Sequence, residues 1–225
     1  MFRKPLLCLV TARRRVCDGC DEAMARRCLV DQAKQAIDAG IDLIQIREPD
    51  LEGAALFDIV SEVVSLARSS SARVIVNDRL DVAIAAGAAG VHLPGRSMPP
   101  AAARRLAPPG FLIGRSVHRE DDESVTSDAV DYLIAGTVFP TASKPDAARL
   151  IGEDGLSAIV RAARCPVLAI GGLTLDAIPR VARGGAFGIA AIGLFMGDRG
   201  PCRAVPLRDT VAAVRAAFDT PQAGP

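Results

Sequence analysis

The sequence of 225 residues contains no tryptophan, one tyrosine and two histidines, so few side chains are available for proton transfer near pH 7. Acidic and basic residues almost cancel, to a net charge of +1, which excludes the strong cationic excess typical of proteins that bind nucleic acid or anionic membranes. No apolar run reaches the roughly 18 residues that span a bilayer, and Leu6–Val10 is too short for a signal-peptide core. We therefore expect a cytoplasmic protein with neither nucleic acid nor a membrane as partner.

Cysteine is present but does not form a recognisable metal motif. Cys17 and Cys20 make a C-x-x-C pair, whereas a zinc site needs a second matching pair and only Cys28 is near. Cys8 and Cys165 fall in apolar runs and are expected in the core. We interpret the cysteines as reduced thiols of a cytosolic chain, and the sequence assigns no role to Cys17, Cys20 or Cys28.

The chain is rich in short apolar runs that recur every 20–30 residues or so with helical patterns between them, an alternation typical of a parallel sheet with crossover helices. Eight such runs are candidate strands: Leu6–Val10, Asp42–Ile46, Arg73–Val76, Gly90–Leu93, Phe111–Ser116, Asp131–Ala135, Pro166–Ile170 and Phe187–Ile192. The clearest helical patterns are Ala25–Ala39, Leu56–Ala67, Asp81–Ala86 and Val205–Ala217. This count predicts an α/β fold, a (β/α)₈ TIM barrel formed by residues 1–225 as one domain, with 219–225 as a disordered tail.

A doubly wound sheet is the alternative fold. It would more often carry a glycine-rich nucleotide loop after the first strand, where this chain has Thr11-Ala12-Arg13.

Polar side chains follow most of the predicted strands. In a barrel the C-terminal strand ends meet at one mouth, so we expect these side chains to lie together there. They are Gln45 and Arg47, Asn77 and Asp78, His92, Ser116 and His118, and Thr141, Ser143 and Lys144.

Glycines follow the last two strands. Gly171 and Gly172 come before a helix, and Ile192-Gly193 follows the eighth strand. Backbone amides free of Cβ atoms can hold a phosphate, and barrels frequently bind phosphate with these two loops. The alternative is that the glycines only make tight turns.

His118 is the first candidate for proton transfer and His92 the second, since a neutral imidazole both takes and gives a proton near pH 7. Either histidine could instead be a satisfied structural residue. Asp78 could bind a metal or pair with a neighbouring cation, but magnesium normally needs further oxygen ligands.

In its motifs and their order, the chain resembles the superfamily of thiamine phosphate synthases and TenI-type thiazole tautomerases over nearly its whole length. The motifs are Ile44-Gln45-Ile46-Arg47-Glu48, Val76-Asn77-Asp78-Arg79, Gly90-Val91-His92-Leu93, Ile113-Gly114-Arg115-Ser116-Val117-His118, Gly136-Thr137-Val138-Phe139-Pro140-Thr141 and Ala169-Ile170-Gly171-Gly172. The resemblance implies a TIM barrel that acts on a small phosphorylated thiazole in thiamine biosynthesis.

The superfamily runs two reactions. The synthase joins hydroxymethylpyrimidine pyrophosphate to thiazole phosphate with magnesium, and the tautomerase aromatises a thiazole phosphate carboxylate without metal. Pro49 stands where synthases usually have a Lys, and Ser97 where they usually have a metal-binding Asp. Both changes remove charge that a pyrophosphate leaving group would use. We therefore expect a tautomerase-like isomerase without a cofactor, with His118 as the acid–base group and Lys144 as a second catalytic residue.

Other residues favour the alternative, a thiamine phosphate synthase, which is a transferase. Thr141, Ser143 and Lys144 resemble its pyrophosphate loop, and Asp78 would then hold magnesium. A third alternative is a non-catalytic regulator that binds thiazole phosphate. The expected substrate-binding residues are Gln45, Arg47, Asn77, Ser116, Thr141 and Ser143, and the expected phosphate-binding residues are Gly171, Gly172, Ile192 and Gly193. The exact substrate and assembly into a homo-oligomer stay open.

Overall fold

The computed structural model describes residues 2–141, 150–196 and 206–219. Its strands are parallel, pair in chain order and close into a barrel, because β1 (Leu6–Val10) pairs with both β2 (Leu43–Ile46) and β8 (Gly188–Ala191). Between them lie β3 (Arg73–Asn77), β4 (Gly90–Leu93), β5 (Leu112–Val117), β6 (Tyr132–Gly136) and β7 (Val167–Ile170). The predicted TIM barrel is confirmed, and every predicted strand is present to within one residue at each end.

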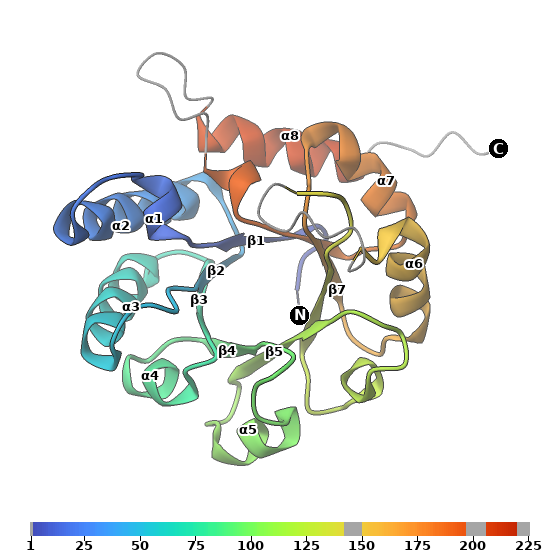
Figure 1. Ribbon diagram of the computed structural model, residues 1–225, viewed down its shortest axis with the longest axis horizontal. Helices are drawn as coiled ribbons and strands as arrows, with labels where there is room; N and C mark the ends of the chain where they lie inside the picture. The colour runs from blue at the N-terminus through green and yellow to red at the C-terminus, as the bar shows by residue number, and fades with distance from the viewer. Residues whose placement is uncertain (1, 142–149, 197–205, 220–225) are drawn as a thin grey trace.

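Helices form an outer ring around the strands (Figure 1). They are α1 (Arg13–Val16), α2 (Glu22–Ala39), α3 (Gly53–Ala67), α4 (Leu80–Ala85), α5 (Pro100–Leu106), α6 (Gly152–Ala162), α7 (Ile178–Arg183) and α8 (Leu207–Asp219). Between β5 and β6 a short 3₁₀ turn, η1 (Glu123–Thr126), takes the place of a helix. Two further 3₁₀ turns, η3 (Leu175–Ala177) and η4 (Gly193–Phe195), follow β7 and β8. Within the described ranges no helix is long and apolar enough to cross a bilayer.

The end of the chain departs from the expectation at one residue. The expected tail began at residue 219, but α8 runs to Asp219. Residues 220–225 lie outside the described part, as does Val205 at the expected start of this helix.

The strands are buried on both faces, which is why they appear as continuous apolar runs rather than as alternating ones. In β1, Leu6, Cys8 and Val10 point into the barrel, whereas Leu7 and Leu9 pack against the helices. The interior is filled by side chains such as the fully buried Tyr132. The barrel is therefore a packed core, and chemistry is left to its mouth.

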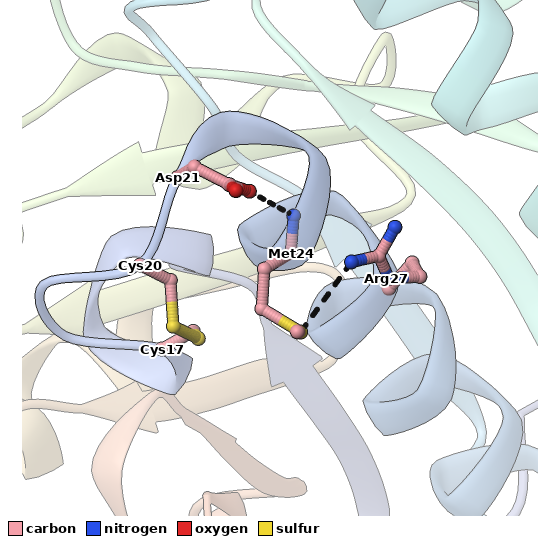
Figure 2. Close-up of a disulfide and its surroundings, with 5 residues drawn as sticks. All are labelled: Cys17, Cys20, Asp21, Met24 and Arg27. Atoms are coloured by element: carbon pink, nitrogen blue, oxygen red, sulfur yellow. Dashed lines mark hydrogen bonds between the residues drawn. A yellow bond between two sulfur atoms is a disulfide. The ribbon is translucent and has the colours of Figure 1, made fainter.

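The structure corrects the interpretation of the cysteines as reduced thiols for one pair, whereas Cys8, Cys28 and Cys165 are free. Cys17 and Cys20 form a disulfide in the loop between α1 and α2 (Figure 2). The next residue, Asp21, caps α2 by accepting a hydrogen bond from the Met24 amide at 2.7 Å. The disulfide closes a loop of four residues, and together with the cap it fixes where α1 ends and α2 begins.

Candidate active site

A cavity of about 560 Å³ lies at the C-terminal ends of the strands. The polar and glycine residues expected at this mouth meet around it. Those that line it are Gln45, Arg47, Asn77, Ser116, His118, Thr141, Gly171, Gly172, Ile192 and Gly193, together with His92. Asp78 is not part of the lining, and the expected residues Ser143 and Lys144 lie outside the described part of the chain.

Two amides from neighbouring strands are joined on one wall of the cavity. The Gln45 Nε2 atom donates to Asn77 Oδ1 at 3.1 Å. Gln45 is buried, and within the described residues its Oε1 atom has no hydrogen-bond partner. Buried acceptors are rarely left unpaired, so this oxygen is available to a donor on a bound molecule.

His92 and Ser116 form a second pair, with 2.8 Å between Nε2 and Oγ. Burial lowers the pKa of His92 to about 3, and the positive charges of Arg115 and Arg47 act in the same direction. His92 is therefore neutral near pH 7 and poorly suited to donate a proton, which argues against it as the second proton-transfer candidate. The Ser116 hydroxyl is engaged with this ring, although the residue still lines the cavity.

His118 is held differently. Its Nδ1 atom hydrogen-bonds to the carbonyl oxygen of Gly136, and a carbonyl only accepts. Nδ1 therefore carries a proton, which leaves Nε2 as the basic nitrogen of the neutral ring.

The glycines of the two expected phosphate loops are under different structural constraints. Gly171 and Gly172 have φ of 102° and 63°, and added Cβ atoms would overlap Thr137 and the Phe139 and Pro140 carbonyl oxygens, respectively. Tight packing of the β6 loop thus explains both glycines without a ligand.

Gly193 has no such constraint. Apart from the adjoining backbone, the described atom nearest to a Cβ placed there is Nη2 of Arg15, at 3.9 Å, and the φ of Gly193 is not in the left-handed region. The open space above Gly193 leaves its backbone accessible from the cavity.

A buried arginine ties the loops after β1 and β2 together. Arg13, 1% exposed, bonds Glu22 at 2.7 Å, Glu48 at 3.0 Å and Asp50 at 2.6 Å. Its guanidinium lowers the pKa of Glu22 and of Asp50, and the pKa of Arg13 is raised by these hydrogen bonds against the opposing effect of burial. A buried charge is tolerated only when it is paired in this way.

The same network orients a cavity residue. Thr11 Oγ1 donates to Glu48 at 2.6 Å and accepts from the backbone N–H of Arg47 at 3.0 Å. The Arg47 side chain is exposed and, among the described residues, has no ion-pair partner, so its charge is free to meet an anion.

Comparison with known proteins identifies the relatives of this barrel. The chain matches the family described as thiamine monophosphate synthase over residues 15–195. The chain belongs to this family. A thiamine-phosphate synthase of Methanoculleus marisnigri is 40% identical over 87% of this chain and 94% of its own length. One from Methanoregula boonei is 43% identical over 74% of this chain and 77% of its own length.

Solved structures agree with the family. Thiamine phosphate pyrophosphorylase from Pyrococcus furiosus superposes with a TM-score of 0.77 at 32% identity, over 95% of both chains. A 3-hexulose-6-phosphate synthase, 18% identical with a TM-score of 0.64 over 96% of this chain and 100% of its own, shares the fold alone.

The expectation of a thiazole tautomerase is wrong. It depended on Pro49 and Ser97, whereas the curated relatives that match most of the chain are named thiamine-phosphate synthases. Two side-chain differences on mouth loops said less about the reaction than the similarity to the synthases over most of the chain. The broader prediction, an enzyme of thiamine biosynthesis, is supported by family membership.

The structure limits how a family member with Ser97 could hold magnesium. Asp78 is exposed at the end of β3 with φ of 66°, and its backbone N–H donates to the His92 carbonyl at 2.8 Å. In the described part of the chain no three acidic, His or Cys side chains cluster as a metal site. A single carboxylate fits a magnesium ion that takes most of its ligands from phosphate oxygens and water.

Among the described residues, one charged residue of the cavity was missed by the sequence analysis. Arg15 lines the cavity from α1, five residues beyond the end of β1. A search limited to strand ends does not reach it, although the run Arg13-Arg14-Arg15 directly after a strand was a visible signal.

Proposed function

We propose that this chain is a thiamine-phosphate synthase, a transferase that joins hydroxymethylpyrimidine pyrophosphate to thiazole phosphate and releases pyrophosphate. The observation that carries the proposal is the 40% identity to a thiamine-phosphate synthase over 94% of that protein's length. The mouth cavity supports it, because it is lined by the open backbone of Gly193 and by Arg47, which has no ion-pair partner among the described residues.

The reaction exchanges one bond for another. A carbon–nitrogen bond forms between the pyrimidine methylene and the thiazole nitrogen, and the carbon–oxygen bond to pyrophosphate breaks. The leaving pyrophosphate takes the electron pair, so the site must stabilise negative charge on it. In the proposal Arg47, Thr141, Ser143 and Lys144 bind this group.

The remaining residues hold the two rings in place. Gln45 and Asn77 present amide groups from adjoining strands, and Ser116 and His118 contact substrate from β5 and the loop that follows it. The thiazole phosphate sits on the loops of Gly171, Gly172, Ile192 and Gly193. Magnesium bound by Asp78 and the pyrophosphate would supply further charge neutralisation to the leaving group.

The test is incubation of the purified protein with both substrates, with magnesium or with a chelator. Thiamine phosphate and pyrophosphate should appear in equal amounts, and omission of either substrate should abolish both products. Binding of thiazole phosphate with no product under any condition would reject the synthase and support the non-catalytic regulator.

A further inference from the structure

The short helix α1 carries three consecutive arginines, of which two bind carboxylates and the third faces the cavity. Arg13 is buried among three carboxylates. Arg14 is exposed and pairs with Glu22 and Asp50 at 3.2 and 2.9 Å. Arg15 instead lines the mouth cavity, together with Ala12 three residues before it on the same side of the helix. One turn of helix thus places the Arg15 guanidinium at the cavity, while Arg13 and Arg14 tie the helix to Glu22 and Asp50.

Arg15 has no ion-pair or hydrogen-bond partner for its side chain in the part of the chain that the structure describes. Its exposed guanidinium approaches Gly193, with Nη2 3.9 Å from a Cβ placed there. An unpaired arginine that faces open glycine backbone inside a cavity is suited to a phosphate, since its planar fork can donate two hydrogen bonds.

The topology explains why this arginine meets a loop from the other end of the chain. Closure of the barrel pairs β1 with β8, so the segment after β1 stands beside the segment after β8. Around the mouth, the loop of Gly193 is therefore followed by Arg15 and then by Arg47 after β2.

The position of α1 is fixed from both sides. The Arg13 ion pairs hold its start, and the Cys17–Cys20 disulfide closes the loop directly after it (Figure 2). Little ordering of the helix is then needed when an anion binds, which favours binding.

We infer that Arg15 is a substrate-binding residue that contacts the phosphate of thiazole phosphate across the Gly193 loop. The inference rests on the proposed synthase activity for the identity of the ligand, but the anion-binding role of Arg15 does not depend on it. Because Gly193 is close to its guanidinium and belongs to the loop proposed for the thiazole phosphate, we assign Arg15 to that phosphate rather than to the pyrophosphate.

The experiment compares Arg15→Gln with Arg14→Gln, which removes the same charge from the same helix but not from the cavity. For Arg15→Gln, the KM for thiazole phosphate should rise about 10–100-fold, the effect of losing a hydrogen bond to a charged group. The kcat and the KM for the pyrimidine pyrophosphate should change less than about threefold, and Arg15→Lys should recover part of the loss. Thermal unfolding checks that each variant is folded.

Equal kinetics of Arg15→Gln and Arg14→Gln would overturn the inference, and so would a rise confined to the KM for the pyrimidine pyrophosphate. The dissociation constant of inorganic phosphate, measured by calorimetry on all variants, separates this proposal from the synthase activity. If the wild type makes no thiamine phosphate, the proposed function fails. Weaker phosphate binding by Arg15→Gln alone would still support the anion site, and unchanged binding would reject it.

Discussion

His92 offers a quantitative test of the electrostatics at the mouth. Its pKa falls from an ordinary value of about 6.5 to about 3 because the ring is buried and faces the charges of Arg115 and Arg47. This difference disfavours the imidazolium in the folded protein by about 5 kcal/mol. Because the unfolded chain binds the proton more tightly, the stability due to neutral His92 is complete above about pH 6.5 and is lost as the pH falls toward 3.

At pH 5 the unfolded histidine is almost fully protonated and the folded one is not, which costs about 2 kcal/mol relative to pH 8. We therefore expect the free energy of unfolding, measured in urea, to fall by about 2 kcal/mol more in the wild type than in His92→Gln over this range. Glutamine suits the comparison because its amide can reach Ser116 Oγ, the partner of the ring Nε2. Carboxylates that titrate in acid change the free energy of unfolding of both proteins equally, so their effect cancels when the wild type is compared with His92→Gln.

The chain has only one other histidine, so the spectrum of His92→Gln identifies the ring resonances of His92 by their absence. In NMR spectra, the ring resonances of His92 should stay constant between pH 8 and 5. Parallel stability curves for His92→Gln and the wild type, or titration of those resonances above pH 5, would refute the electrostatic argument.

Three further predictions concern the loops of the mouth. Arg13→Met removes the shared partner of three carboxylates and should lower the free energy of unfolding by about 3–5 kcal/mol. Replacing the exposed Arg14 by Met should lower it by less than about 1 kcal/mol, and similar losses for both variants would contradict the buried network. Replacing Cys17 and Cys20 by serine should cost about 2 kcal/mol, the entropy of a four-residue loop, and an unchanged urea midpoint would show that the bond contributes nothing. Gly193→Ala should fold normally, because its methyl group enters open space at the cavity, yet its affinity for inorganic phosphate, measured by calorimetry, should fall about tenfold. Wild-type affinity would show that Gly193 is not part of the phosphate site.

The barrel was predictable because its strands are short, buried on both faces and separated by regular intervals. The helices were less predictable, and not only where they were short: the six-residue α4 was expected, whereas the eleven-residue α6 was missed. The six-residue α7 (Ile178–Arg183) makes less than two turns and shows no apolar stripe long enough to recognise, and α5 (Pro100–Leu106) is almost as short. The η1 turn has no helical pattern to detect, because it buries little beyond Ser124 and Val125.

The site was predictable wherever its residues lie at or near the C-terminal end of a strand, as Gln45, Asn77 and Ser116 do. Site residues that come from a loop or short helix beyond the strand end were harder to predict. Arg15 reaches the cavity only because α1 is folded back and held by Arg13, a tertiary contact with Glu48 across the chain. No local pattern encodes that contact, so the sequence showed three adjacent arginines but not which of them faces the cavity.

The same reasoning explains why Ser97 and Pro49 misled the choice of reaction. Losing a Lys or a metal-binding carboxylate excludes a pyrophosphate leaving group only if the charge must come from those two positions. A barrel mouth collects side chains from eight strand ends, so a cation lost from one loop can be replaced from another. Here the described residues place unpaired guanidiniums, Arg15 and Arg47, on neighbouring loops of the cavity. The charge of such a site is a property of the closed ring of loops, and it is judged from the assembled mouth rather than from single positions in a motif.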